Sequence, residues 1–111
     1  MKILLDENLP RKLKTDFGPG FEVKTVRDMQ WLGKKNGELM GLLVFNGFDF
    51  FITVDKNLRH QQNLDKFLVT IFLLVVPNNR LETLQKLVEK VTLIKLSSIS
   101  KKSKLHSLKS N

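Results

Sequence analysis

Two aspartates follow short apolar runs in this 111-residue chain. Asp6 comes directly after Ile3-Leu4-Leu5, and Asp55 comes directly after the apolar run 50–54. An apolar run that stops abruptly at an acid is typical of a buried parallel strand reaching the edge of its sheet. If these two strands are parallel neighbours, both carboxylates lie at the edge where open parallel sheets bind their ligands.

A third acid, Glu38, stands near the start of a predicted helix that precedes the second of these strands. Converging carboxylates repel one another unless a cation neutralises them, and their hard oxygen atoms suit Mg²⁺ or Mn²⁺. Such an ion could activate water and stabilise charge on a phosphodiester. The sequence therefore predicts an acidic metal site in which Asp6, Glu38 and Asp55 are catalytic. Taken singly, each acid is also explained by helix capping, the helix dipole or a turn.

The elements that must position these acids alternate along the chain. We expect strands at 2–5, 21–26, 50–54, 69–76 and 92–96. Helical spacing of apolar residues predicts helices after Asn8, from Asn36 to Gly47, and over 81–91. This order favours an α/β fold in which a parallel sheet is flanked by helices on both faces.

Composition excludes several classes of protein. The chain has no cysteine, so it has neither disulfides nor cysteine-ligated zinc. The longest apolar stretch, residues 67–76, is far shorter than the roughly 20 residues that span a membrane. Asp6 and Glu7 interrupt the first apolar run too early for a secretory signal. We expect a cytoplasmic protein with one domain over 1–96 and a basic, Ser/Lys-rich, flexible tail over 97–111.

The formal net charge of +8 favours a polyanionic partner such as RNA. Basic residues in or beside the segments near the proposed edge could hold phosphates: Arg11, Lys12, Arg27, Lys34, Lys35, Lys56 and Arg59. A solvated basic surface explains any one of them equally well. Trp31 could stack on a base, although covering a loop is the more ordinary role for a partly buried tryptophan.

Three segments together carry a resemblance to a known family. ILLDENLP (3–10), TVRDMQWLGKKNGEL (25–39) and FITVDKNL (51–58) resemble the PIN-like domain family, specifically the small bacterial proteins related to toxin components of toxin–antitoxin systems. The resemblance extends over roughly residues 1–96. It implies a three-layer α/β/α sandwich with a mainly parallel central sheet of about five strands.

The same resemblance implies an activity. PIN-like proteins are metal-dependent endoribonucleases, so the likeness implies RNA as substrate, Mg or Mn as cofactor, an antitoxin protein as partner, and a homodimer. It assigns the metal ligands to Asp6, Glu38 and Asp55. PIN nucleases usually add a further acid shortly after the last of these. Here Lys56 and Asn57 follow instead, and Asn57 could supply an oxygen to the metal or to its water. A PIN-like binding module with weak or no catalysis is therefore an open alternative.

A receiver-like phosphoacceptor domain is a second alternative. Receiver domains also carry an acidic pair after the first strand and an aspartate after the third, as Asp6-Glu7 and Asp55 do here. They need a serine or threonine at the end of the fourth strand, where this chain has Val75-Val76-Pro77. They also need a lysine after the fifth strand, whereas Lys95 lies inside the strand predicted at 92–96.

Overall fold

A five-stranded parallel sheet forms the centre of the molecule in the computed structural model, which describes residues 1–60, 67–78, 80–96 and 105–109. The strands are β1 (Lys2–Leu5), β2 (Glu22–Thr25), β3 (Phe50–Thr53), β4 (Thr70–Val75) and β5 (Leu105–Lys109). They lie in the order β2-β1-β3-β4-β5, and every neighbouring pair is parallel. The prediction of an α/β fold with a parallel sheet of about five strands is confirmed.

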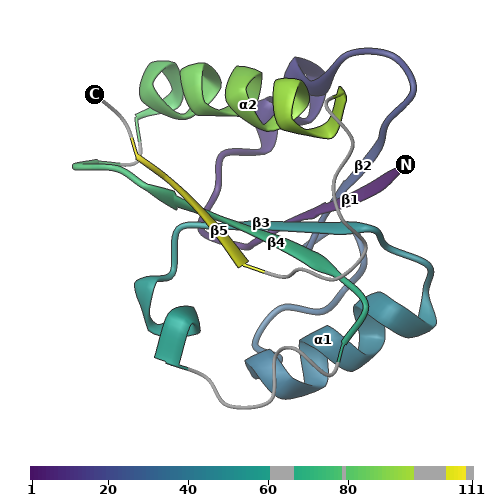
Figure 1. Ribbon diagram of the computed structural model, residues 1–111. Helices are drawn as coiled ribbons and strands as arrows, with labels where there is room; N and C mark the ends of the chain where they lie inside the picture. The colour runs from purple at the N-terminus through teal and green to yellow at the C-terminus, as the bar shows by residue number, and fades with distance from the viewer. Residues whose placement is uncertain (61–66, 79, 97–104, 110–111) are drawn as a thin grey trace.

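Helices cover the sheet on both faces (Figure 1). The 3-10 helix η1 (Arg11–Phe17) and α2 (Leu81–Leu96) lie on one face, while α1 (Asn36–Phe45) and the 3-10 helix η2 (Lys56–His60) lie on the other. Side chains alternate between the two cores: Ile3 and Leu5 of β1 point into one, and Leu4 points into the other. Because the central strands are buried on both faces, their sequences are continuous apolar runs. No helix among the described residues is long and apolar enough to cross a membrane.

The chain changes direction across the sheet between β1 and β3. From β1 it moves outward to β2, and then it crosses back to place β3 on the other side of β1. Leu5 pairs with Ile52 in the β1–β3 register, so the next residues, Asp6 and Thr53, lie side by side where the strands end. Such a reversal point opens a crevice beyond the carboxyl ends of the strands, because the two connections leave to opposite faces.

The C-terminal part of the chain differs from the prediction. The strand predicted at 92–96 is wrong, because these residues extend α2 to Leu96. The apolar and β-branched residues after Val91 imitate a strand, but the buried positions Leu84, Leu87, Val88 and Val91 set a helical period that the chain continues.

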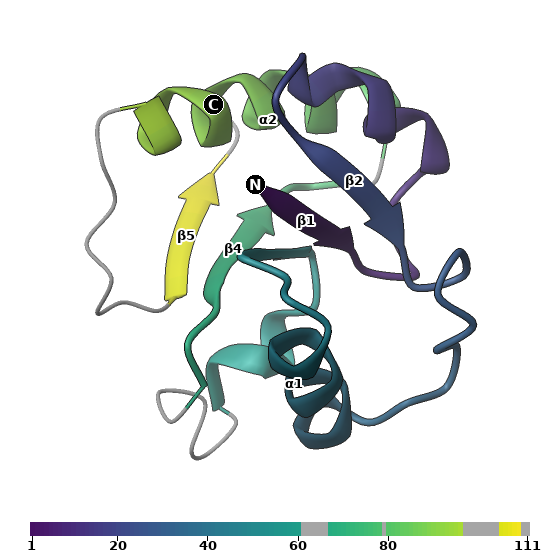
Figure 2. The same ribbon diagram turned by 90° about the vertical axis from the view of Figure 1, so that its right-hand side faces the viewer.

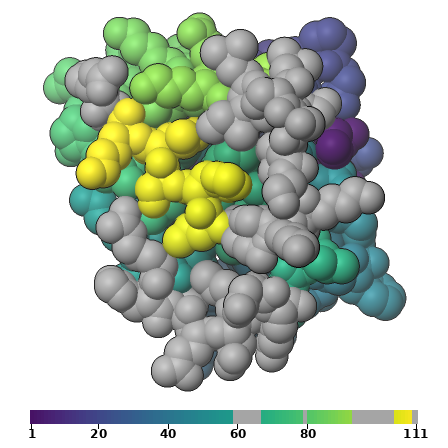
Figure 3. Space-filling model, in the orientation of Figure 1, coloured from purple at the N-terminus to yellow at the C-terminus, as the bar shows by residue number. Residues whose placement is uncertain are grey.

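The fifth strand instead comes from the segment predicted as a flexible tail. β5 pairs with β4 from Ile71↔Leu105 to Val75↔Lys109, so the domain does not end at residue 96. The strand lies at the surface of the molecule below α2 (Figure 3). Its own side chains are at most half-buried, which suits an edge strand, whereas residues 71–74 of β4 are fully buried. The rest of the predicted tail, residues 97–104 and 110–111, lies outside the described residues.

Candidate functional site

Asp6 and Asp55 lie where the neighbouring strands β1 and β3 end. The Asp6 backbone N–H donates to the Ile52 carbonyl at 2.9 Å, which extends the strand pairing by one residue. The buried Thr53 hydroxyl donates to Asp6 Oδ2 at 2.6 Å, and the Thr53 Oγ1 atom accepts the Asp55 backbone N–H at 3.0 Å. One hydroxyl therefore links the Asp6 carboxylate to the Asp55 backbone.

Thr53 is a site residue that the sequence analysis missed. It is one of the two buried polar side chains among the described residues, the other being Thr25. The available signal was a single hydroxyl within the apolar run 50–54, two residues before the aspartate. Threonine is common in strands for its shape alone, so its presence gave no indication of a polar role.

The environments of the two aspartates differ. Burial raises the pKa of Asp6 above its ordinary value of 3.8, and hydrogen bonds from Thr53 and from the Glu7 backbone N–H partly offset this effect. Asp55 instead caps its own turn, because its Oδ1 accepts the Asn57 backbone N–H at 3.0 Å. Each Asp6 carboxylate oxygen accepts one hydrogen bond within the protein and can accept another interaction. Asp6 can therefore still bind a cation that enters the cleft.

A cleft of about 740 Å³ opens beyond these strand ends. Its lining residues are Asp6, Glu7, Asn8, Val26, Trp31, Lys34, Lys35, Asn36, Gly37, Glu38, Leu39 and Asp55. They come from the ends of β1 and β3, from the β2–α1 connection and from the first turn of α1. Figure 2 shows this connection running past the ends of β1 and β2 toward α1. The size is that of a small-molecule or nucleotide site.

All three acids of the predicted metal site line this cleft, but they do not form one group. The Glu38 side chain is 57% exposed and accepts an ion pair from Lys34 Nζ at 3.5 Å. Within the described residues, no set of three or more histidine, cysteine, aspartate or glutamate side chains is close enough to hold a metal ion. Asp6 and Asp55 remain as a pair of hard oxygen donors. Such a pair suits Mg²⁺, which is often held by one or two carboxylates together with water and substrate phosphates.

The predicted RNA-binding residues do not all lie at the cleft. Lys34 and Lys35 line the same cleft as the two aspartates. The side chains of Lys12, Arg27 and Lys56 are exposed outside the lining, and so is that of Asn57, the predicted additional metal ligand. Arg59 belongs to η2, but its side chain lies outside the described part of the chain.

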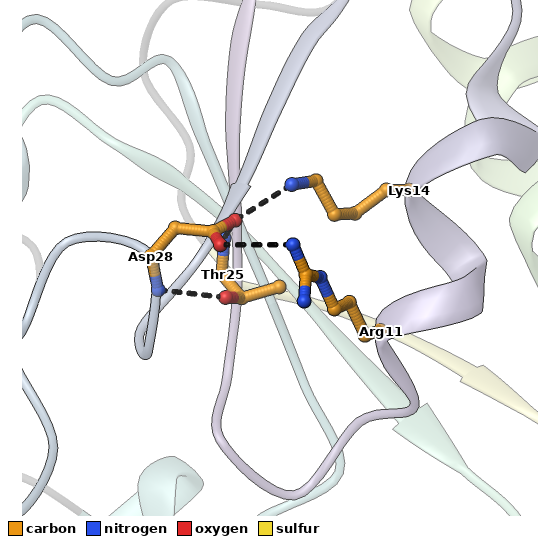
Figure 4. Close-up of polar contacts among 4 residues, drawn as sticks. All are labelled: Arg11, Lys14, Thr25 and Asp28. Carbon is orange, nitrogen blue, oxygen red and sulfur yellow. Dashed lines mark hydrogen bonds and ion pairs between the residues drawn. The ribbon is translucent and has the colours of Figure 1, made fainter.

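Arg11 joins a structural network instead (Figure 4). Asp28 Oδ2 accepts bonds from Lys14 Nζ at 2.7 Å and from the Thr25 backbone N–H at 2.9 Å, and its N–H donates to the Thr25 hydroxyl. Arg11 Nη2 lies 3.9 Å from Asp28 Oδ1. The Lys14 contact, with the bonds from Thr25, lowers the pKa of Asp28 from 3.8 to about 2. The network ties η1 to the start of the connection that carries Trp31.

Comparisons with known proteins found no match to this chain among protein-family models, curated proteins or solved structures. The resemblance to PIN-like proteins therefore rests on the motif residues alone.

Proposed function

We propose that this protein is a metal-dependent ribonuclease of the PIN-like class that hydrolyses RNA phosphodiesters in the cleft. The observation that carries the proposal is the pair Asp6 and Asp55, joined through the Thr53 hydroxyl and lining the same cleft as Lys34 and Lys35. A cleft lined by two carboxylates and two lysines suits a phosphodiester, because the carboxylates can hold a cation and both the cation and the lysines attract phosphate oxygens.

Six residues in or next to the cleft have roles in this proposal. Asp6 and Asp55 hold a Mg²⁺ or Mn²⁺ ion, which when bound supplies Lewis-acid charge and lowers the pKa of water. Thr53 is a positioning residue, since its hydroxyl bonds the Asp6 carboxylate and the Asp55 backbone. Lys34 and Lys35 hold phosphates, supported by the first turn of α1, whose N–H groups have no partner within the helix and favour anions. Glu38 orients Lys34 and is not itself a metal ligand.

The test is RNA cleavage with Mn²⁺ by the full chain and by single variants. Asp6→Asn and Asp55→Asn are each expected to lower the cleavage rate by about a hundredfold or more, since the loss of a metal ligand removes the charge that stabilises the transition state. Glu38→Gln is expected to lower the cleavage rate by about tenfold or less, because it disturbs the neighbouring Lys34 and removes no metal ligand. Glu89→Gln, an exposed acid on α2, controls for charge. Cleavage that survives both aspartate substitutions contradicts the proposal.

The same residues admit a PIN-like module that binds RNA or an antitoxin protein without cleaving. The absence of a third grouped acid among the described residues supports this alternative. Calorimetric titration with Mn²⁺ separates the two. The ribonuclease requires binding that Asp6→Asn and Asp55→Asn each remove, whereas no binding at millimolar metal favours the module.

The receiver-like function is a second candidate, because two observations favour it. The strand order β2-β1-β3-β4-β5 is the order found in receiver domains. Lys109, and not Lys95, is the lysine at the end of the fifth strand. Against it, β4 ends at Val75 and is followed by Val76-Pro77, with no hydroxyl there to hold a phosphoryl group. Incubation with acetyl phosphate and Mg²⁺ decides: a phosphorylated Asp55 supports this function, and an unmodified one rejects it.

A further inference from the structure

Trp31 is held rigidly at the wall of the cleft. Its backbone N–H donates to the Val26 carbonyl at 2.9 Å, and its own carbonyl accepts the Lys34 N–H at 3.2 Å. Gln30, the residue before it, has a φ of 62°, a left-handed conformation that side-chain-bearing residues rarely adopt. A strained residue inside a well-bonded turn indicates that the surrounding structure fixes the direction of the next side chain.

Trp31 packs on the core and also lines the cleft. Its ring meets the buried Phe48 ring edge-on, with centroids 5.9 Å apart and planes at 65°. Trp31 nevertheless stays only half-buried and lines the same cleft as Asp6 and Lys35. Covering the core explains the contact with Phe48. It does not explain why a large aromatic side chain is left partly open beside two carboxylates and two lysines.

We propose that Trp31 is a base-stacking platform and that the cleft takes an unpaired nucleotide. The base lies on the open part of the indole, and an adjoining phosphate lies on Lys34 or Lys35. Stacking on an aromatic side chain tolerates any base but needs a base that is not paired in a duplex. This inference rests on the proposed function, since it adds a base-binding residue to that site.

The chain provides its own probe, because Trp31 is the only tryptophan and there is no tyrosine. The full chain is titrated in EDTA with a short single-stranded RNA, so that no cleavage occurs. A stacked base is expected to quench the fluorescence in a saturable way. An oligomer of the same length and charge with abasic positions, and a duplex of the same sequence, are expected to quench little. Equal quenching and affinity for the abasic oligomer overturn the proposal, because binding then depends on phosphates alone.

Variants provide a second measurement, the affinity for a labelled RNA. Trp31→Leu is expected to lower the affinity for single-stranded RNA about tenfold or more, which is the usual effect of losing one stacked base. The affinity for the abasic oligomer is expected to stay unchanged. Trp31→Phe keeps a ring and is expected to retain most of the affinity. Leu32→Ala, an exposed neighbour outside the lining, is the control. If Trp31→Leu unfolds, the comparison of the two oligomers on the unaltered chain still decides. Unchanged affinity in a folded Trp31→Leu overturns the platform.

The two proposals fail separately. If Asp6→Asn keeps full cleavage while base-dependent quenching persists, the ribonuclease mechanism fails and the platform stands. If Asp6→Asn abolishes cleavage and quenching does not depend on the bases, only the platform fails.

Discussion

Asp6 and Asp28 show how position decides what an aspartate does. Asp6 lies at the end of a buried strand, where burial raises its pKa and the folded protein disfavours its charge. Asp28 lies in a turn beside Lys14, which lowers its pKa to about 2 and makes its charge favourable. The first arrangement costs stability at neutral pH and is typical of a functional site, while the second supports the fold. The two aspartates therefore give opposite predictions.

Asp6→Asn is expected to stabilise the folded protein at neutral pH. Because the pKa of Asp6 is higher in the folded state than 3.8, the folded state binds more protons than the unfolded state, and stability falls as pH rises through that interval. Asparagine removes this cost and can still bond to Thr53. The gain is measured as the free energy of unfolding in urea at pH 7, and it should vanish well below pH 3.8, where Asp6 is protonated in both states. An Asp6→Asn variant that is less stable than the parent at pH 7 contradicts this prediction.

Asp28→Asn is expected to have the opposite effect. The lowered pKa contributes stability that is present above about pH 5 and lost as pH falls to about 2. Because the side chain is partly exposed, the loss at pH 7 is expected to be only about 1 kcal/mol or less. Thermal unfolding followed from neutral to acid pH checks this. The two proteins should differ at pH 7 and converge toward about pH 2. A difference that is independent of pH would show that the charge of Asp28 is not its cause.

Thr53→Val tests the hydroxyl that joins the two aspartates. Its removal is expected to raise the pKa of Asp6 further, because the bond from Thr53 lowers that pKa. It also leaves the Asp55 N–H without this acceptor, at a cost of about 1–3 kcal/mol. Thr53→Ser keeps the hydroxyl and should restore both properties. Carboxyl carbon NMR titration of Asp6 is the readout. A pKa of Asp6 that does not change in Thr53→Val would exclude the proposed positioning role.

The most deeply buried elements were the easiest to predict, because a strand that is buried on both faces has a continuous apolar sequence. β1, β3 and β4 are buried on both faces, so their apolar runs identified them and placed Asp6 and Asp55 at one edge. β5 was missed because an edge strand with Ser107 and Lys109 on it has the composition of a loose tail. Thr53 and Trp31 depend on long-range contacts, which a local pattern does not contain.

α1 allows a prediction at the scale of one element. From Leu39 to Phe45 every residue is apolar or glycine, yet Leu43 is fully buried and Phe45 is 88% exposed. Leu43→Ala is expected to lower the free energy of unfolding by about 2–5 kcal/mol, because it leaves a cavity in the core. Phe45→Ala should change it by about 0.5 kcal/mol or less. Urea denaturation measures both. Comparable destabilisation by the two would mean that Phe45 is covered in solution.

At the scale of the molecule, one edge of the sheet depends on the segment Leu105–Lys109. The segments that follow β1 and β3 line the cleft, and β3 pairs in turn with β4. β5 pairs with the other edge of β4, and its residues belong to the segment that was predicted to be a tail. The site and the last strand are far apart in the chain, but the continuous hydrogen-bonded sheet connects them.

A chain cut after residue 96 tests this dependence, because that is where the predicted domain ended. Without Leu105–Lys109, the buried strand β4 presents an unpaired edge, and Leu108 no longer packs on the core beneath α2. The shortened chain is expected to unfold at lower urea, with a broader transition and greater binding of a hydrophobic dye. Removing only residues 110–111 is the matched control and should leave unfolding unchanged. If the chain of residues 1–96 unfolds as cooperatively and at the same urea concentration as the full chain, β5 contributes nothing to the fold, and the domain ends where the sequence alone had placed it.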